Sequence, residues 1–423
     1  MTTTQSTAAT PGQPAPQQRF DLVLRGERVL TDGGFGPAEV GIRDGRIAAV
    51  EPLGTGLDSS GEVIELADDE VLIPGLVDSH VHVNEPGRTE WEGFASATRA
   101  AAAGGVTTII DMPLNSLPPT VGVAALETKQ EAARGQCFVD VGFWGGAVPG
   151  NTGDLHPLHE VGVFGFKCFL SPSGVPEFPP LEPAEMEADL TELVRDDALL
   201  IVHAEDGHVL DQAPPATPGR HYADFLASRP AQAESSAIAA VIEAARRTGG
   251  RAHILHLSDA GALPMIAAAR ADGVRLSVET CPHYLSLASG SVPDGATAYK
   301  CCPPIREQSN QDRLWQGLLD GTIDIIVTDH SPSPLDLKAV DTGDFAVAWG
   351  GVASLQIGFR VVWTEAHRRG IPLEQVVQWM SAGPADLVGL PGKGRIGVGA
   401  DADTPAPGTK EEVAVDSDRL HHT

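Results

Sequence analysis

Two histidines separated by one residue follow an apolar stretch, and they limit the possible folds more than any other feature of the chain. Val71–Arg88 reads VLIPGLVDSHVHVNEPGR, which places His80 and His82 at the end of the apolar run. Alternate residues of a β-strand point to the same face, so both imidazoles would project from one side of one strand end. Two such rings suit one metal ion. An isolated pair is more often a half-buried strand end, so a metal site requires further ligands elsewhere in the chain.

From residue 71 onward, apolar runs alternate with helical patterns. The runs are nearly continuous, as in parallel strands that are covered on both faces. Eight of them in alternation with helices predict a (β/α)8 barrel, or TIM barrel, of the α/β class rather than a doubly wound sheet. The expected strands are Val71–Val83, Gly105–Pro113, Phe138–Gly145, Val163–Leu170, Ala198–Ala204, Ala252–Leu257, Val274–Thr280 and Asp324–Thr328. The helices expected between and after them are Trp91–Ala103, Ala124–Ala133, Pro183–Val194, Ala233–Arg247, Ala260–Ala271, Gln308–Leu319, Val352–Arg368 and Leu373–Met380.

The remaining parts of the chain flank this barrel. Residues 1–19, rich in Thr, Gln, Pro and Ala, are expected to form a disordered tail. Residues 20–70 contain short alternating strands and a hairpin signal at Arg43–Arg46, which predict a small β-sandwich-like domain. The barrel is assigned to residues 71–385, and residues 386–423 to a short, turn-rich return toward the β domain.

The charge of the chain excludes some classes of partner. Its 423 residues include 29 Lys and Arg against 57 Asp and Glu, a formal net charge of −28. Such an acidic protein repels phosphate backbones and anionic lipid headgroups, so we expect neither nucleic-acid nor membrane partners. No apolar run is long enough to span a membrane, and the first residues lack the charged and apolar regions of a secretory signal. Five cysteines without a CxxC pair fit a reducing compartment, and the predicted location is the cytoplasm.

Further ligand-type residues stand at the ends of later strands, where barrel enzymes build their sites. Lys167 lies within GFKCFL, His203 follows LLIV, His256 ends HILH and Asp329 follows IIVT. Each alone has a simpler explanation, such as a hydrogen-bonded core histidine or a turn aspartate. Lys167 is the hardest to explain in that way, because lysine is rarely buried without a partner. Together with the histidine pair these residues predict one metal centre, and the histidines left outside it are His253, His283 and His330.

The lysine gives this centre its chemistry. A buried lysine has a lowered pKa, and its neutral amine can react with CO2 to give a carbamate whose two oxygens bridge two cations. Zn²⁺ fits the nitrogen and oxygen ligands best, with Mn²⁺, Co²⁺ and Fe²⁺ as alternatives. Asp329 would act as the catalytic residue by taking a proton from the attacking water and passing it to a leaving nitrogen. One ion is expected on His80, His82, carbamylated Lys167 and Asp329, and the other on the carbamate, His203 and His256.

With these residues in place, the chain resembles the binuclear metal-dependent cyclic amidohydrolases, and among them the allantoinase family. The resemblance covers roughly Asp21–Asp403 and includes GLVDSHVHVNEPGRTEWEGF, AAAGGVTTIIDMPLN, FKCFL, SGVPEFPPL, ETCPHYL and CCPPIR. It implies hydrolysis of the hydantoin ring of allantoin to allantoate in purine and ureide catabolism. It also implies two divalent metal ions, an N6-carboxylated Lys167 and a homotetramer.

Two positions separate this chain from neighbouring branches of the family. Dihydroorotases carry an arginine for the substrate carboxylate where this chain has Asn84. Hydantoinases and dihydropyrimidinases place a tyrosine after the strand-four lysine, at the position of Pro172. A carbonyl donor would then come from Ser171, Ser173, backbone N–H groups or the metal. These two branches stay as alternative functions, and a non-enzymatic assembly protein on the same fold is a remote third.

The resemblance also marks substrate positions and one departure. Gly350 and Gly351 lie where the family holds the ring with backbone groups, and Cys302 occupies a substrate-side position where alanine is expected. In the family, the segment at Asp401–Asp403 continues into hydrophobic strands that complete the β domain. Here it continues TPAPGTKEEVAVDSDRLHHT, which we interpret as a truncated or divergent end.

Overall fold

The structure, a computed structural model, describes residues 19–408 and 419–421. The disordered tail expected over residues 1–19 and most of the polar end therefore lie outside the described residues. The described chain forms two compact units, one of residues 19–73 with 396–408 and one of residues 74–395 with 419–421. None of its helices is both long enough and apolar enough to cross a membrane.

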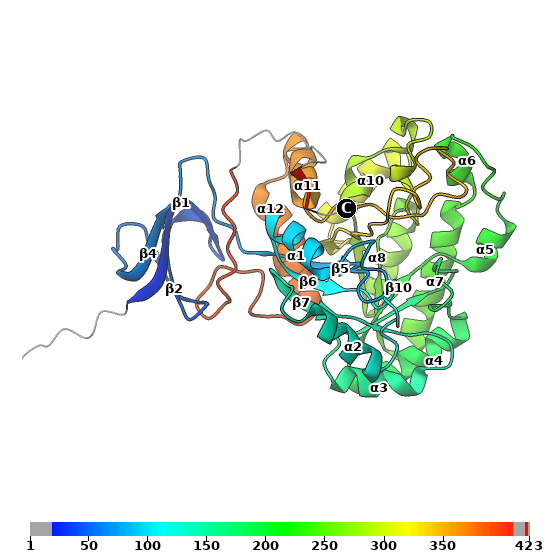
Figure 1. The fold of residues 1–423 in the computed structure, drawn as a ribbon, viewed down its shortest axis with the longest axis horizontal. Helices are drawn as coiled ribbons and strands as arrows, with labels where there is room; N and C mark the ends of the chain where they lie inside the picture. The colour runs from blue at the N-terminus through cyan, green and yellow to red at the C-terminus, as the bar shows by residue number, and fades with distance from the viewer. Residues whose placement is uncertain (1–18, 409–418, 422–423) are drawn as a thin grey trace, which may run out of the picture. The chain divides into compact units, whose positions relative to one another are not determined.

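The smaller unit is built on one four-stranded sheet in the order β3-β2-β1-β4. Figure 1 labels β1, β2 and β4 of this sheet. Its strands are β1 (Phe20–Thr31), β2 (Gly34–Arg43), β3 (Arg46–Pro52) and β4 (Ser59–Glu65). The predicted hairpin forms at Asp44 and Gly45, whose φ angles of +51° and +71° give the two-residue turn that joins twisted antiparallel strands. Leu24, Val40 and Ile47 pack with Ile396 in the core. A second sheet, as in a sandwich, is not present among the described residues of this unit.

The larger unit is a barrel of parallel strands. One ladder joins β5-β6-β7, and a second joins β8 through β13 in chain order. The chain passes from the first ladder to the second at Trp144, between β7 and β8. The backbone N–H of Trp144 donates to the Asp111 carbonyl at 2.9 Å, and the N–H of the next residue, Gly145, donates to the Gly165 carbonyl at 2.9 Å. The barrel closes where the His82 N–H donates to the His330 carbonyl at 2.8 Å. The strands are β5 (Leu76–Val81), β6 (Val106–Asp111), β7 (Asp140–Phe143), β8 (Gly145–Gly146), β9 (Phe166–Phe169), β10 (Leu199–His203), β11 (Arg251–Ile254), β12 (Leu276–Thr280) and β13 (Ile325–Ile326).

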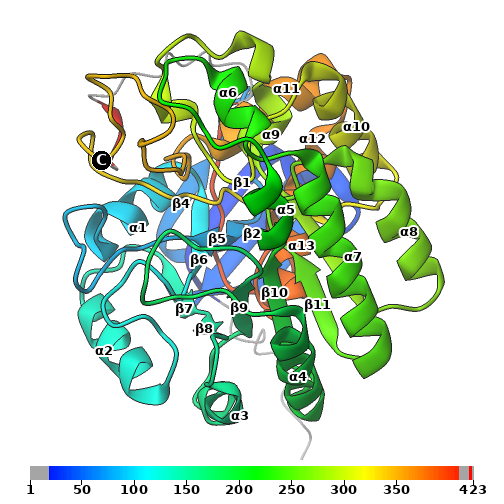
Figure 2. The same ribbon diagram turned by 90° about the vertical axis from the view of Figure 1, so that its right-hand side faces the viewer.

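Helices surround these strands (Figures 1 and 2). The longest, α7, buries Ala237, Ile238, Val241 and Ile242 along one face and ends at Gly249 with φ +72°, a left-handed cap that glycine adopts without strain. The helices are α1 (Phe94–Ala103), α2 (Val123–Ala133), α3 (Thr152–Glu160), α4 (Pro183–Leu193), α5 (Gly207–Gln212), α6 (Tyr222–Ala227), α7 (Ala231–Thr248), α8 (Leu263–Ala271), α9 (Pro282–Ser286), α10 (Gln308–Leu319), α11 (Gly358–Arg368), α12 (Leu373–Val377) and α13 (Gly383–Leu387).

The (β/α)8 barrel predicted from the sequence is confirmed. Each strand is shorter than the apolar run from which it was predicted. β13 is the clearest case, because the run Asp324–Thr328 contributes only Ile325 and Ile326 to the ladder. The left-handed φ of +46° at Asp329 turns the chain out of the strand direction. Five helices were not expected, namely α3, which contains Pro157, and the short α5, α6, α9 and α13.

Candidate metal centre

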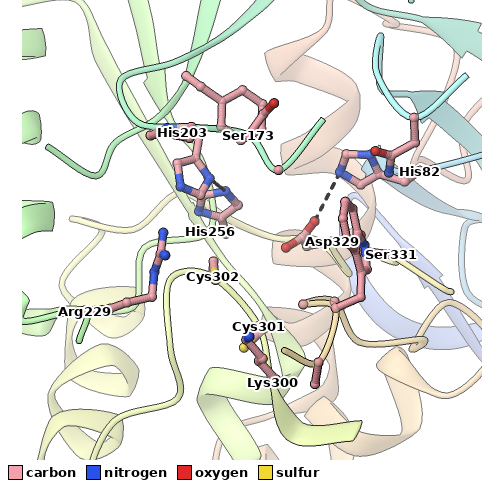
Figure 3. Close-up of a pocket in the computed structure, with 18 of the residues that line it drawn as sticks. His82, Ser173, His203, Arg229, His256, Lys300, Cys301, Cys302, Asp329 and Ser331 are labelled. Atoms are coloured by element: carbon pink, nitrogen blue, oxygen red, sulfur yellow. Dashed lines mark hydrogen bonds and ion pairs between the residues drawn. The ribbon is translucent and has the colours of Figure 1, made fainter. Parts of the chain in front are cut away.

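Six side chains from five strands meet at the carboxyl end of the barrel. His80 lies in β5 and His203 ends β10, whereas His82 and Asp329 follow their strands within a few residues. All six are buried. Figure 3 shows His203 and His256 next to each other, and His82 linked to Asp329. The structure thus brings together the six residues predicted as ligands: His80, His82, Lys167, His203, His256 and Asp329.

The first end of the centre is organised around one carboxylate oxygen. Oδ1 of Asp329 lies 3.0 Å from Nε2 of His80 and 3.5 Å from Nε2 of His82. Nζ of Lys167 lies 3.4 Å from Nε2 of His80. Donor atoms of His80, His256 and Asp329 all lie within 4.8 Å of one another, so the first end adjoins His256 of the second. The two-residue spacing of the strand therefore delivers both imidazoles to the same oxygen, as the sequence predicts.

The second end is a pair of imidazoles. Nδ1 of His203 lies 3.0 Å from Nε2 of His256. Two nitrogens at this separation can share one ion at the Zn–N distance of about 2.0–2.1 Å. The His203 ring stacks on Phe169, with ring centroids 4.6 Å apart and an angle of 23° between the planes. Packing on Phe169 fixes the plane of the ring.

Two buried glutamates orient the histidines, and the sequence analysis did not identify either. His80 Nδ1–H donates to Glu279 Oε1 at 2.5 Å, and His203 Nε2–H donates to Glu205 Oε2 at 2.8 Å. Each bond fixes the proton on the outer nitrogen, so the inner nitrogen presents a lone pair to the centre. Arg229 in turn donates to both Glu205 oxygens, at 3.0 and 2.5 Å.

The donor set fits a metal ion on physical grounds. With the proton of neutral His80 held by Glu279, its Nε2 lone pair faces the acceptor oxygen Oδ1 of Asp329. Two acceptors 3.0 Å apart repel each other unless a proton or a cation lies between them. Four imidazoles and a carboxylate, together with Lys167 if it were carbamylated, would form the kind of nitrogen and oxygen set that holds Zn²⁺ and similar ions.

Burial and charge set the protonation of these groups. Burial opposes a charge on His80, but the Asp329 and Glu279 carboxylates outweigh it and raise the pKa of His80 to about 9. Burial lowers the pKa of His82 to about 3 and also lowers the pKa of His203. Burial lowers the pKa of Lys167 to about 8, which brings the neutral amine required for carbamylation close to neutral pH.

Two of the proposed ligands have unusual backbone conformations. His256 has φ +37° and Asp329 has φ +46°, in the left-handed region that residues with a Cβ adopt at a cost. Both lie just beyond the ends of their strands. The strain aims each side chain into the barrel mouth instead of along the strand.

The other histidines near the centre have separate surroundings. His253 Nε2–H donates to Glu279 Oε2 at 3.0 Å, so it supports the glutamate rather than the centre itself. His330 accepts the Ser354 N–H at 3.1 Å through Nδ1. His283 is buried, and neither of its ring nitrogens has a hydrogen-bond partner among the described residues.

A cavity of about 330 Å³ opens onto the centre and includes His82, Lys167, His203, His256 and Asp329 in its lining. Of the substrate positions predicted from the sequence, Ser173, Cys302, Gly350 and Gly351 line this cavity. The Ser173 hydroxyl is engaged, since it donates to the Phe178 carbonyl at 2.6 Å. Asn84 and Ser171 are buried and are not among the lining residues. β5 ends at Val81, so strand alternation no longer carries Asn84 to the face of His80 and His82.

The cavity wall at residues 345–351 is held by two lysines. Lys300 Nζ donates to the Phe345 carbonyl at 2.6 Å, and Lys338 Nζ donates to the Gly351 carbonyl at 2.5 Å. Gly351 has φ +127°, and a Cβ there would lie 2.3 Å from the Ser331 carbonyl oxygen. Only glycine fits this position, so the backbone at Gly351 reaches the cavity unshielded.

Known proteins similar to this chain agree on one family. The model of the amidohydrolase family matches residues 71–404. The chain is 57% identical to an allantoinase of Streptomyces avermitilis, covering 95% of this chain and 89% of that protein. It is 46% identical to a protein named "Allantoinase, mitochondrial" of Aquarana catesbeiana, covering 87% and 76%.

Solved structures similar to this chain support the same family. The L-hydantoinase (dihydropyrimidinase) from Arthrobacter aurescens is similar with a TM-score of 0.85 and 29% identity, covering 90% of this chain and 86% of that one. The dihydropyrimidinase from Brevibacillus agri has the same TM-score and identity, and the match covers 95% of this chain and 88% of that one. The chain belongs to the amidohydrolase family and, within that family, to the allantoinases.

Proposed function

We propose that the chain is a metal-dependent allantoinase, which opens the hydantoin ring of allantoin to give allantoate in purine catabolism. The convergence of six buried donor residues carries the proposal of metal-dependent hydrolysis: five of them line one cavity, and the sixth, His80, lies 3.0 Å from Asp329. The substrate is supported by curated allantoinases that are 40–57% identical over most of the chain. The hydantoinase alternative rests on solved structures that are 29% identical or less.

The proposed cofactor is a pair of divalent ions, with Zn²⁺ as the favoured metal. His80, His82 and Asp329 would hold one ion, His203 and His256 the other, and carbamylated Lys167 would contact both. When bound, the ions would supply positive charge that polarises a ring carbonyl and makes water a stronger nucleophile. Retention of the full donor set argues against a non-enzymatic assembly role.

The chain's own residues handle the proton and the ring. Asp329 accepts a proton as the water oxygen attacks the ring carbonyl, and it returns that proton to the ring nitrogen when the C–N bond breaks. The products of that bond cleavage are a carboxylate and a free ureido group. Gly350 and Gly351 both line the cavity, and the backbone of Gly350 offers hydrogen bonds to the ring amides. The Gly351 N–H already donates to the Lys300 carbonyl at 2.8 Å, and its carbonyl accepts from Lys338.

Competition between substrates tests this function. Metal-loaded protein should open allantoin with a higher kcat/KM than hydantoin, dihydrouracil or dihydroorotate. A site that hydrogen-bonds its substrate rejects analogues lacking those groups by large factors. A higher kcat/KM for dihydroorotate or dihydrouracil would overturn the substrate assignment and leave the metal chemistry standing.

Compartment and assembly belong to the same proposal. All five cysteines are free, which supports a reducing compartment such as the cytoplasm. One relative is named as mitochondrial, so cell fractionation is the deciding measurement. A homotetramer is proposed from the family resemblance, and light scattering of purified protein would show a different mass if it is wrong.

A further inference from the structure

A second cluster of metal-type donors lies beside Asp329, and the proposed centre uses only the aspartate from it. Sγ of Cys281, a ring nitrogen of His283 and a carboxylate oxygen of Asp329 all lie within 4.8 Å of one another. Cys281 directly follows β12, and His283 lies in α9, so both come from the loop side of the neighbouring strand. All three residues are buried.

His283 gives an independent reason to expect a ligand here. The residue is only 3% exposed, yet neither ring nitrogen has a hydrogen-bond partner among the described residues. Buried polar atoms in folded proteins nearly always have a partner, because an unpaired one costs stability. The ring packs on Tyr284 at 4.1 Å between centroids, which supplies packing but no hydrogen bond to either nitrogen.

The donors differ in kind from those of the proposed catalytic centre. That centre offers nitrogen and oxygen, whereas Cys281 adds sulfur, which favours soft cations such as Cd²⁺ and Zn²⁺ over Mg²⁺ or Ca²⁺. A carboxylate has two oxygens and about four lone-pair positions. Asp329 can therefore contact an ion of the centre and a further ion on the side of Cys281.

We propose that Cys281, His283 and Asp329 form a third cation site that takes a soft divalent ion, and that filling it inhibits turnover. Binding replaces the thiol proton of Cys281 by the cation, and this proton is released to solvent. A cation on Asp329 competes with the transfer of the water proton to that carboxylate. The inhibitory part rests on the proposed hydrolytic function, whereas the binding part does not.

Cadmium titration of the full-length protein tests the binding. Protein already loaded with two Cd²⁺ should take up a third, counted by elemental analysis, with a sulfur-to-cadmium charge-transfer band in the ultraviolet. Cys281→Ser should lose both the band and the third ion. His283→Phe keeps the thiol and the ring but removes the nitrogens, and it should lose the third ion or require more Cd²⁺ for it.

Two further variants serve as matched controls. Cys301→Ser removes another buried thiol outside the cluster, and Cys137→Ser removes the exposed one; both should keep the band. A band that persists in Cys281→Ser, or a wild-type protein that stops at two ions, would overturn the site.

Turnover of allantoin, followed during the same titration, should fall as the band grows in the wild type and not in Cys281→Ser. Unchanged turnover at full occupancy of the third site would overturn the inhibitory role. Because band and ion count need no turnover, a protein that binds the third ion without opening allantoin would refute the proposed function and not this site.

Discussion

At each end of the candidate centre a histidine donates to a buried glutamate, but the two glutamates have different partners. At one end His80 donates to Glu279, and at the other His203 donates to Glu205. Glu205 is paired with the Arg229 guanidinium through both of its oxygens. Glu279 has no arginine or lysine bonded to it among the described residues and instead accepts bonds from the His253 ring and the His256 N–H.

This difference determines which histidine is charged when no ion is bound. Asp329 and Glu279 outweigh the effect of burial and raise the pKa of His80 to about 9, so the first end keeps a proton. At the second end Arg229 already balances Glu205, and burial lowers the pKa of His203. One end is therefore protonated and the other is neutral, although both show a histidine backed by a glutamate.

Lys167→Ala should disable both ends of the centre, and it has the largest expected effect. Without a carbamate, neither end has a shared anion, so both ions and turnover should be lost together. Elemental analysis and an allantoin assay measure this, and a small carboxylate with bicarbonate should restore part of both. Lys167→Arg, which keeps the cation but cannot form a carbamate, should behave like the alanine variant. Two ions and normal turnover in Lys167→Ala would refute the bridging role.

Asp329→Asn acts on the first end alone. The amide keeps the size and one oxygen donor but cannot accept a proton at neutral pH, so kcat should fall by roughly 10²–10⁴-fold. Metal content should fall less than turnover, and measuring both on one sample separates the two roles. Near-normal kcat would remove Asp329 from proton transfer.

Glu279→Gln and Glu205→Gln sharpen the contrast between the ends. Each should weaken the ion at its own end by about 10–100-fold, as expected for the partner of a ligating histidine. Glu205→Gln also leaves Arg229 without its carboxylate, so it should cost more stability, on the order of 3 kcal/mol. Metal titration and thermal unfolding of the pair provide the comparison. Equal unfolding temperatures would show that Arg229 does not need Glu205.

The smallest effect is a pH dependence that differs between the ends. Below the His80 pKa of about 9, an ion at the first end must displace a proton, so its affinity should fall by up to about tenfold from pH 8 to pH 7. His203 is neutral in this range and loses no proton. Calorimetry in two buffers of different ionisation enthalpy counts the protons released with each ion. Equal proton release at both steps would contradict the assigned charge states.

The barrel and the six donors could be predicted because each depends on local pattern. An apolar run followed by a histidine or lysine marks a strand end whatever surrounds it. Glu279 carried the same signal, a charged residue inside the apolar run LSVETC, and Glu205 lies two residues after His203. Their roles depend on which neighbouring strands face them, as with Glu279 and His80, 199 positions apart in sequence.

The substrate side was less predictable for a related reason. Asn84 follows the end of β5, where alternation stops applying, and its N–H donates to the Glu92 carbonyl at 3.0 Å. The hold of Lys300 and Lys338 on the wall at 345–351 leaves no periodic signal, because both lysines bind backbone carbonyls. Loop contacts of this kind are set by tertiary packing rather than by residue type.

The proposed metal ligands lie in strands or directly after them, whereas the cavity wall at residues 345–351 lies in a loop. This division has a consequence for how such enzymes diverge. Donors fixed on strands stay in register when a loop is replaced, so selectivity can change while the hydrolytic machinery is inherited intact. The segment 345–351, anchored by the ammonium groups of Lys300 and Lys338, is then the natural place to redesign this protein for another cyclic amide. Its length and glycines could be exchanged for those of a hydantoinase without altering a single proposed ligand.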